Sequence, residues 1–339
     1  MSKLLFRADG NAQIGMGHVM RCLALARMLD RSFRFAVVRP APEVVRLIEE
    51  ANGTVVPFTT NDVAELLTIV TPDDVAILDG YTFDETYQRA VRERAKKLIF
   101  IDDLIAGHQI ADVVINHADG ISDADYDAEP YTQFCLGPRY ALLRPEFLQP
   151  EGFGSPPVDG PIFVNLGGAD PNNTSLTVLK AIRQVDPALL VDLVLGAFHP
   201  NRAAIEAFQG QLPSLTILQN LSAAQMISEL QQCSLAITAC STIAYEVCAV
   251  NRPLITIVTA ENQDRLAQFL SEEKLALSVN FPTLLTRLTP VISLENMLKL
   301  AIQGFQFSPD VALDTLANQR RFFDGRSPDR FRALFDKLC

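Results

Sequence analysis

The amino-terminal stretch, residues 3–29, reads KLLFRADGNAQIGMGHVMRCLALARML. Its apolar opening, residues 3–8, is typical of a buried strand, and the apolar positions that follow His18 repeat with the period of a helix over 18–30. The loop between them contains three glycines. Glycines let the backbone come close to a ligand while the first helical N–H groups point at it. The stretch therefore predicts the first β–loop–α unit of an α/β fold, with an anion-binding loop.

Two familiar nucleotide-binding motifs do not fit this loop. A dinucleotide fingerprint needs a third glycine where the chain has Met20, and an acid at the end of the second strand, where it has Arg39. A Walker loop needs Lys followed by Ser or Thr where the chain has Met16 and Gly17. The sequence therefore excludes both motifs.

The same alternation of strands and helices continues through both halves of the chain. In the first half, further strands are predicted at 33–38, 54–56, 75–78, 97–101 and 112–115, with helices at 42–51, 62–70 and 84–96. In the second half, strands are predicted at 162–166, 189–195, 215–218, 235–238 and 253–258, each followed by a helix, and the chain from about residue 291 onward is predicted to be helical. Apolar strands separated by helices are typical of parallel sheets covered on both faces.

The length of the chain, 339 residues, exceeds the usual size of one domain. The pattern restarts after a stretch rich in proline and glycine at 145–161, which is the best linker candidate. We therefore predict an amino-terminal Rossmann-like domain at 1–150 and a carboxyl-terminal Rossmann-like domain with terminal helices at 158–339. Because ligands of such sheets bind at the carboxyl ends of the strands, the site is expected in a cleft between the domains.

The charge balance excludes several classes of partner. With 29 Lys and Arg against 40 Asp and Glu, the net charge is −11, which is the wrong sign for binding nucleic acid or an anionic membrane surface. No apolar run reaches membrane-spanning length, and the start of the chain lacks a secretory-signal pattern. The six cysteines form no C-x-x-C pair, which favours free thiols. We expect a cytoplasmic monomer without stable membrane association.

His18 is the strongest candidate for chemistry. It falls in the first turn of the predicted helix, where the positive end of the helix dipole disfavours an imidazolium and keeps the ring able to accept a proton. The alternative is a structural histidine that caps its helix. The four histidines, His18, His108, His117 and His199, have no spacing typical of metal ligands, so no metal or cofactor is expected.

Polar residues follow two later strands of the first half. Asp79 and Tyr81 come after one apolar run, and Asp102 and Asp103 come after the next. Both groups are expected at the carboxyl edge of the first sheet, where they could touch a substrate. Aspartate is also a common helix cap, so for each acid taken singly a structural role is the open alternative.

The first β–α turn of the second half resembles a phosphate cradle. Gly167 and Gly168 run from a strand toward a helix, with Asp170 close behind them. Two adjacent glycines exceed what a turn alone needs, and the helix that follows points its first N–H groups at the turn. An ordinary tight turn is the alternative.

A later turn of the second half carries small hydroxyl residues. Ser241 and Thr242 stand at a helix start, and Glu246 lies one turn later on the same face. Hydroxyls suit a phosphate and a carboxylate suits a ribose diol, whereas the alternative is an N-cap pair with a surface acid. The next strand ends in Asn262 and Gln263, whose amides are expected to face the cleft.

These motifs together resemble one family over nearly the whole chain. They are Gly15-x-Gly17-His18-x-x-Arg21, Gly167-Gly168-x-Asp170, Ser241-Thr242-x3-Glu246 and Asn262-Gln263. The chain is similar to the UDP-sugar hydrolases of pseudaminic acid biosynthesis, a family that is similar in fold to the MurG-like GT-B glycosyltransferases. The resemblance implies a GT-B-like α/β fold, with two Rossmann-like parallel-sheet domains facing an interdomain cleft.

The resemblance also implies a reaction and a set of roles. The family hydrolyses UDP-2,4-diacetamido-2,4,6-trideoxy-β-L-altropyranose to free sugar and UDP, with inversion at the anomeric carbon and without a metal, in nonulosonic acid biosynthesis for flagellin glycosylation or surface polysaccharide. By resemblance, His18 is the base for water, and Tyr81 and Asn262 position the substrate. The residues implied in binding substrate or nucleotide are Gly15, Gly17, Arg21, Gly167, Gly168, Asp170, Ser241, Thr242, Glu246 and Gln263.

This small set of groups agrees with the chemistry of the leaving group. Glycoside hydrolases use two carboxylates because an alkoxide leaving group must be protonated. UDP leaves as a stable anion, so one base together with N–H donors on the departing phosphate suffices.

Two alternative functions stay open. A GT-B glycosyltransferase would use a UDP-sugar donor and an acceptor hydroxyl in place of water. A non-catalytic nucleotide-sugar binding protein would keep the UDP site without a competent base.

Overall fold

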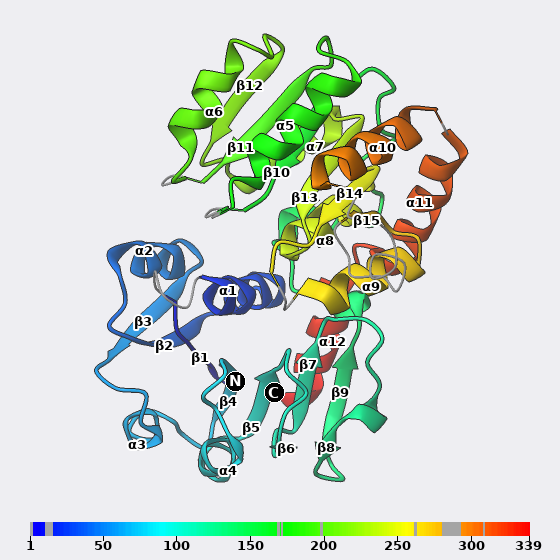
Figure 1. Cartoon of the computed structure of the whole chain (residues 1–339). Coiled ribbons are helices and arrows are strands. Elements are labelled where there is room, and N and C mark those ends of the chain that lie inside the picture. Colours follow the sequence, from blue (N-terminus) through cyan, green and yellow to red (C-terminus); the bar gives the residue numbers. More distant parts are fainter. Residues whose placement is uncertain are drawn as a thin grey trace. The chain divides into compact units, whose positions relative to one another are not determined.

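The structure is a computed structural model that describes residues 3–10, 16–167, 170, 172–196, 199–260, 263–279, 293–307 and 309–339. The described chain forms two compact units (Figure 1), which are Met1–Pro145 with Arg326–Cys339, and Glu146–Gly325. Each unit contains a parallel sheet with helices. The predicted fold class, α/β with two Rossmann-like parallel sheets, is therefore confirmed.

The first unit is built on a parallel sheet with the strand order β3-β2-β1-β4-β5-β7-β9. These strands are β1 (Lys3–Ala8), β2 (Phe33–Val38), β3 (Gly53–Phe58), β4 (Asp74–Asp79), β5 (Lys97–Ile101), β7 (Val113–Asn116) and β9 (Gln133–Leu136). The helices are α1 (Gly17–Leu29), α2 (Pro42–Glu50), α3 (Val63–Leu67), α4 (Glu85–Arg94) and α12 (Ser327–Leu338). A separate short pair joins β6 (His108–Gln109) to β8 (Asp127–Ala128).

The core of the first unit lies on both faces of this sheet. β4 is buried along its whole length, and β1 is buried from its second residue onward. Figure 1 shows α1 and α2 on one face of the sheet and α3 and α4 on the other. This division follows from right-handed crossovers, because the strand order runs one way from β1 to β3 and the other way from β4 to β5.

The second unit is built on a parallel sheet with the strand order β12-β11-β10-β13-β14-β15. These strands are β10 (Ile162–Asn165), β11 (Val191–Leu195), β12 (Leu215–Gln219), β13 (Leu235–Ala239), β14 (Leu254–Ile257) and β15 (Leu277–Val279). The helices are α5 (Thr174–Val185), α6 (Arg202–Gln209), α7 (Ala223–Gln232), α8 (Thr242–Val250), α9 (Asp264–Glu272), α10 (Leu294–Phe307) and α11 (Pro309–Phe322).

The strand order of each sheet reverses at one point, between β1 and β4 in the first unit and between β10 and β13 in the second. Loops that leave neighbouring strands at such a point run to opposite faces of the sheet, and ligands bind in the crevice between them. In the first unit these loops lead to His18 and follow Asp79, and in the second they hold Gly167 and Ser241. The candidate residues of both halves therefore lie where parallel sheets of this kind bind ligands.

Two strands of the sheets were not predicted, β9 and β15. β9 has four residues, β15 has three, and both are edge strands of their sheets. Each of these short segments contains a polar residue, Gln133 in β9 and Ser278 in β15, so neither forms a continuous apolar run, and only the pairing with β7 and β14 identifies them. The predicted helical character of the chain beyond residue 291 is confirmed for the described residues by α10, α11 and α12.

The structure differs from the predicted domain boundaries at the carboxyl terminus. The prediction assigns all residues from 158 to 339 to the second domain, but α12 belongs to the first unit. Arg332 Nε donates to the carbonyl oxygen of Met28 at 2.8 Å, and the ring of Phe331 meets that of Tyr140 at a centroid distance of 5.7 Å. The helical period of this segment shows only that one face is apolar, and it does not show on which sheet that face packs.

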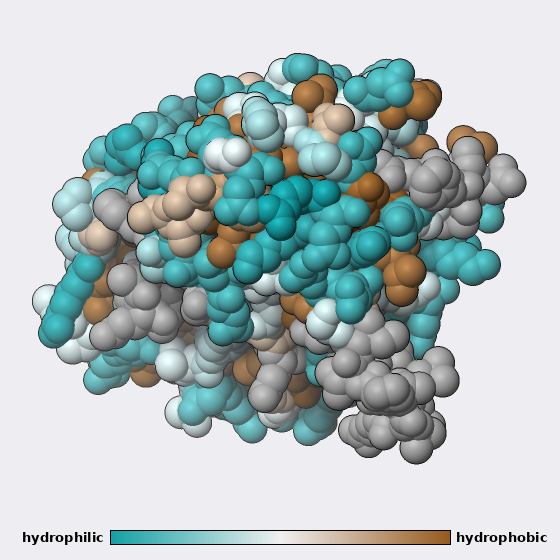
Figure 2. All heavy atoms as spheres, turned by 45° about the horizontal axis from the view of Figure 1, so that its top comes forward, coloured by the Kyte–Doolittle hydropathy of each residue, from teal (hydrophilic) through white to brown (hydrophobic). Residues whose placement is uncertain are grey.

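Within the described ranges, no helix combines the length and the apolar character that crossing a bilayer requires. On the face drawn in Figure 2, hydrophilic side chains predominate and apolar ones are scattered among them.

Replacing Phe331 tests the placement of α12. Phe331 is fully buried, so Phe331→Ala is expected to lower the free energy of unfolding by about 3 kcal/mol. Amide hydrogen exchange should then rise in β1 and β2 and not in β10 and β11. The control is Leu313→Ala, because Leu313 in α11 is 63% exposed and its loss should leave stability unchanged. Faster exchange in the second unit instead would contradict the placement.

Candidate functional site

The site of the first unit forms where β1 and β4 lie side by side. α1 begins at Gly17, so His18 falls in its first turn, while Asp79 is the last residue of β4. The fold brings together two side chains that are 61 residues apart in the sequence, with His18 Nδ1 lying 2.7 Å from Asp79 Oδ1. Within the described residues no side chain caps α1, and its N-cap residue is Met16. His18 therefore pairs with Asp79 rather than capping its own helix.

Arg21 fixes the Asp79 carboxylate from a second side. Its Nε donates to Asp79 Oδ2 at 3.1 Å, and its NH2 group donates to Asp79 Oδ1 at 2.7 Å. Burial opposes the charge of this guanidinium, but Asp79 and then Asp103 outweigh that effect and raise the pKa of Arg21 above its ordinary value. Asp79 is fully buried, and this guanidinium supplies the opposite charge and the hydrogen bonds that a buried carboxylate needs.

This arrangement decides which nitrogen of His18 carries a proton. An ionised carboxylate accepts hydrogen bonds and donates none, so the 2.7 Å contact requires a hydrogen on His18 Nδ1. Arg21 NH2 also lies 2.9 Å from Nδ1, because both donors converge on the same oxygen of Asp79. In the neutral ring Nε2 is then the atom that can accept a proton. A carboxylate that orients a histidine in this way is a common feature of general-base sites.

Tyr81 and Asp103 complete the cluster. Tyr81 follows β4, is 63% exposed, and meets the His18 ring edge-on at a centroid distance of 4.8 Å. Its hydroxyl donates to Asp103 Oδ2 at 3.3 Å, and Arg21 NH1 donates to the same oxygen at 2.8 Å. Partial burial and the charge of Asp103 raise the pKa of Tyr81, so its hydroxyl stays protonated as a donor. The structure thus brings the predicted residues His18, Arg21 and Tyr81 together.

His117 is a further histidine close to this cluster, and the sequence predicts no role for it. It follows β7, and its Nδ1 accepts a hydrogen bond from the backbone N–H of Leu142 at 3.2 Å. Burial, and then the positive charge of Arg21, lowers the pKa of His117 to about 4, so the ring is neutral at physiological pH with its proton on Nε2. Its position directly after a strand is the signal that could have identified it.

The loop after β5, which presents Asp103, is held in place by Asp102. Asp102 Oδ1 accepts from the N–H of Leu104 at 3.1 Å, and Oδ2 accepts from the N–H of Ile105 at 2.9 Å and from the hydroxyl of Tyr126 at 2.9 Å. Ile105 has a φ of 56°, a left-handed conformation that a β-branched residue rarely adopts. The carboxylate of Asp102 therefore stabilises a strained loop instead of contacting His18.

In the second unit, Asp170 occupies the start of α5. Its Oδ1 accepts from the N–H of Thr174 and its Oδ2 from the N–H of Ser175, both at 2.8 Å. These are the N–H groups that the proposed cradle would turn toward a phosphate, and a carboxylate already neutralises them. Gly167 lies after β10 with a φ of 86°. Gly168 lies outside the described residues, as do Gly15 and Asn262.

The start of α8 differs from the start of α5. Its N-cap residue is Ser241, and within the described residues no side-chain hydrogen bond caps this helix. Thr242 is exposed at the first position of the helix, and Glu246 is buried one turn later. The first N–H groups of α8 and the positive end of its dipole therefore suit an anion better than those of α5.

Two other polar side chains of the second unit turn toward their own backbone. Gln263, the N-cap residue of α9, accepts the N–H of Thr259 through Oε1 at 2.8 Å. His199, which was not selected from the sequence as a binding residue, accepts the N–H of Asn201 through Nδ1 at 3.3 Å, and its Nε2 lies 3.6 Å from Asp170 Oδ2. His199 therefore lies beside the residue that caps α5, and among the described residues its buried Nε2 has no hydrogen-bond partner. In the part of the chain that the structure describes, no three His, Cys, Asp or Glu side chains form a group able to hold a metal ion.

Comparison with known proteins gives sequence relatives but no family model that matches the chain. The chain is 24% identical over 277 residues to the UDP-2,4-diacetamido-2,4,6-trideoxy-β-L-altropyranose hydrolase of Campylobacter jejuni, covering 80% of this chain and 97% of that protein. The predicted resemblance is therefore confirmed. The chain is also 23% identical over 341 residues to the spore coat polysaccharide biosynthesis protein SpsG of Bacillus subtilis, covering 98% and 97% of the two chains.

A third relative matches only part of the chain. The uncharacterized protein MJ1062 of Methanocaldococcus jannaschii is 31% identical over 207 residues, which are 57% of this chain. This chain spans 42% of the length of that protein.

Solved structures with the same fold include glycosyltransferases. The calicheamicin glycosyltransferase CalG4 superposes with a TM-score of 0.67 at 15% identity over 99% of this chain and 98% of its own. MurG of Acinetobacter baumannii gives a TM-score of 0.66 at 14% identity over 99% of both chains. HepE of Anabaena in complex with UDP gives 0.59 at 15% identity over 99% and 98% of the two chains. These similarities show the GT-B fold.

The pairing of His18 with Asp79 can be tested by locating the ring proton. Nitrogen-15 NMR of the wild-type chain is expected to find the neutral His18 ring protonated on Nδ1. Asp79→Asn should move that proton to Nε2 and lower the free energy of unfolding by about 3 kcal/mol, since Arg21 loses its buried partner. The control is Asp103→Asn. Asp103 bonds to Arg21 and Tyr81, so this change should leave the tautomer of the His18 ring unchanged. An Nε2-protonated ring in the wild type would contradict the assignment.

Proposed function

We propose that the chain hydrolyses a UDP-activated sugar to free sugar and UDP. The observation that carries the proposal is the bond between His18 Nδ1 and Asp79, which leaves Nε2 to accept a proton at the carboxyl edge of the first sheet. The sequence similarity to a hydrolase of a UDP-sugar supports the choice of substrate class. The finer proposal is a UDP-activated 2,4-diacetamido-2,4,6-trideoxy sugar, as in the name of that relative.

In the proposed reaction, His18 Nε2 takes a proton from water while the water oxygen attacks the anomeric carbon. The bond between that carbon and the phosphate oxygen breaks, and its electron pair leaves with UDP. A single displacement of this kind inverts the anomeric carbon. Asp79 and Arg21 hold the imidazole in position, and Asp79 stabilises the imidazolium that forms. No acid is needed at the leaving oxygen because UDP is already a stable anion.

We assign the nucleotide to the second unit. The open start of α8 would hold the diphosphate, with the Thr242 hydroxyl beside it and Glu246 toward the ribose. Gly167 and Gly168 would line the same diphosphate through their backbone. Asp170 is assigned to shaping that turn, because its carboxylate is already bonded to α5 and would repel a phosphate there.

The cysteines favour a reducing compartment, and we propose the cytoplasm. All six lie in described stretches and are free thiols. Burial raises the pKa of the Cys248 and Cys233 thiols, which makes them poor nucleophiles and poor partners for oxidation.

Replacing His18 tests the role of the base. His18→Ala is expected to lower kcat by roughly 10²–10⁴-fold while the Kd for UDP changes less than a few-fold, because the base acts only in the transition state. UDP release from the UDP-sugar is the assay, and calorimetry gives the Kd. Met20→Ala is the control, since Met20 lies on the same helix and is 36% exposed. Equal losses of turnover and UDP affinity would contradict the role.

Glu246 should show the opposite behaviour. Glu246→Gln is expected to weaken UDP binding by roughly tenfold, because a charge-assisted hydrogen bond contributes about 1.5–3 kcal/mol, with less effect on kcat at saturating substrate. Glu272→Gln on the exposed face of α9 is the matched control. Circular dichroism would exclude misfolding, because Glu246 is buried. Unaltered UDP affinity in folded Glu246→Gln would refute the ribose assignment.

A glycosyltransferase is the second candidate, because the structural neighbours include CalG4 and MurG. The two candidates separate in one assay. Hydrolysis releases UDP at the full rate in the absence of any acceptor, whereas a transferase releases UDP rapidly only when an acceptor hydroxyl is supplied.

A further inference from the structure

A fully buried arginine, Arg7 of β1, lies near the carboxyl edge of the first sheet. Its guanidinium donates to Asp9 through both NH groups, each at 2.7 Å. This bidentate pair compensates a charge that has no access to solvent. Asp9 Oδ1 also accepts the N–H of Val38, the last residue of β2, at 2.8 Å. The guanidinium is therefore a fixed point that other segments at this edge can use.

A chain of polar contacts leads from Arg7 to the turn between β4 and α4. Arg7 NH2 donates to Asn61 Oδ1 as well as to Asp9. Because the oxygen of the Asn61 amide faces the guanidinium, its Nδ2 is the donor on the other side. That group donates to Thr82 Oγ1 at 2.5 Å. Asn61 lies between β3 and α3, and Thr82 directly follows Tyr81, so the contact joins segments that are 21 residues apart.

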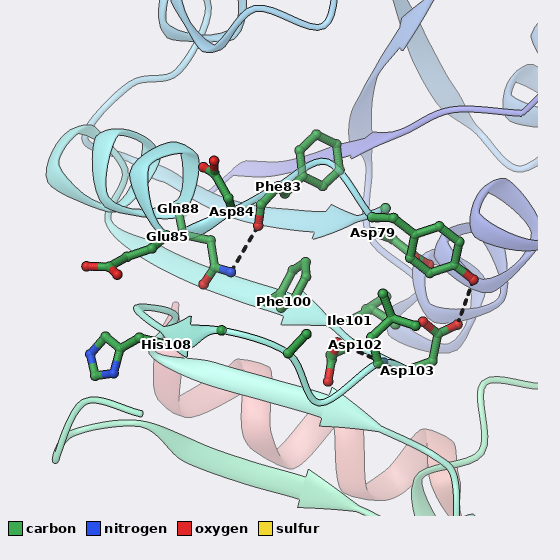
Figure 3. Close-up of a pocket in the computed structure, with 15 residues that line it drawn as sticks. Asp79, Phe83, Asp84, Glu85, Gln88, Phe100, Ile101, Asp102, Asp103 and His108 are labelled. Atoms are coloured by element: carbon green, nitrogen blue, oxygen red, sulfur yellow. Dashed lines mark hydrogen bonds between the residues drawn. The ribbon is translucent and has the colours of Figure 1, made fainter. Parts of the chain in front are cut away.

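The next residue of the turn, Phe83, is held by the same guanidinium. The Arg7 guanidinium carbon lies 5.3 Å from the centroid of the Phe83 ring and 6.0 Å from that of Phe58, which is within the range of cation–π contacts. The carbonyl oxygen of Phe83 accepts Gln88 Nε2 from α4 at 3.1 Å (Figure 3). Both residues that follow Tyr81 are therefore tied to the interior of the first unit.

The side chain of Tyr81 depends on this turn for its position. It is 63% exposed, so core packing does not fix it, and its hydrogen bond to Asp103 is long at 3.3 Å. It nevertheless meets the His18 ring edge-on at a centroid distance of 4.8 Å. The backbone that carries the ring must then be fixed by its neighbours, and the contacts of Thr82 and Phe83 do this.

We propose that Asn61 is a positioning residue that sets the Tyr81 ring against His18 through Thr82. Thr82 is exposed, so water can replace its partner and the loss of this hydrogen bond costs the fold little. The same loss releases the turn on which Tyr81 stands. The consequence for turnover rests on the proposed function, in which His18 is the base, whereas the consequence for the ring contact does not.

Nuclear magnetic resonance of the full chain measures the ring contact. Tyr81→Leu removes the ring and gives the chemical shifts of the His18 ring protons without it. Thr82→Val exchanges the hydroxyl for a methyl group and is expected to move these shifts toward the Tyr81→Leu values, while Thr82→Ser keeps the hydroxyl and should retain the wild-type shifts. The control is Thr68→Val, an exposed threonine at the end of α3 whose hydroxyl donates to the carbonyl oxygen of Glu65.

Turnover gives a second readout, with UDP-2,4-diacetamido-2,4,6-trideoxy-β-L-altropyranose as the substrate. Thr82→Val is expected to lower kcat by roughly tenfold and to leave the Kd for UDP unchanged, because a misplaced group beside the reacting centre reduces the rate. Asn61→Ala should have the same effect. The double variant should lose no more than either single variant, since both changes remove the same bond.

Unchanged His18 shifts in folded Thr82→Val would overturn the inference, and so would losses that add in the double variant. Circular dichroism and the denaturation midpoint check the fold, and Thr82→Val tests the bond from its exposed side if Asn61→Ala does not fold. Altered shifts in a chain that releases no UDP from any nucleotide sugar would refute hydrolysis and leave the positioning role of Asn61 standing.

Discussion

The site of the first unit depends on one buried carboxylate, that of Asp79. It has no access to solvent, so both of its oxygens must be satisfied by protein donors. His18 and Arg21 supply those donors from successive turns of α1. The guanidinium of Arg21 also forms an ion pair with Asp103. Because Asp79 ends a central strand that is buried along its whole length, the position of the imidazole is tied to the core of this unit.

Two helices of the second unit differ in what neutralises the positive end of the helix dipole. In the second unit, Asp170 bonds the first N–H groups of α5, so that end of the helix is already neutralised by the chain itself. α8 begins with Ser241 and Thr242, and within the described ranges no side-chain bond caps it. The dipoles of the two helices are equivalent, and the presence or absence of a local carboxylate decides which of them suits an external anion.

The fold and much of the candidate site follow from local patterns. Apolar runs at the strands, glycines in the loops and periodic helices predicted the parallel sheets, because these features depend on residues that are near one another in the sequence. The resemblance to a known family groups His18, Arg21 and Tyr81 in one site, and the structure brings these three side chains together. The sequence does not distinguish the role of Asp79 from that of an ordinary helix cap. An aspartate that follows a strand has the same sequence context whether it bonds to the backbone of the next turn or to a distant histidine.

The sequence by itself determined the order of strands and helices, the glycine loops at the strand ends, and the acidic balance of the chain, since each is a property of composition or of short spacing. Only the tertiary structure decided that α12 packs in the first unit, that Asp79 orients His18, and that Asp102 holds the loop that presents Asp103. The physical reason is that strand order and helix docking are set by contacts between residues far apart in the chain, and no local period records those contacts.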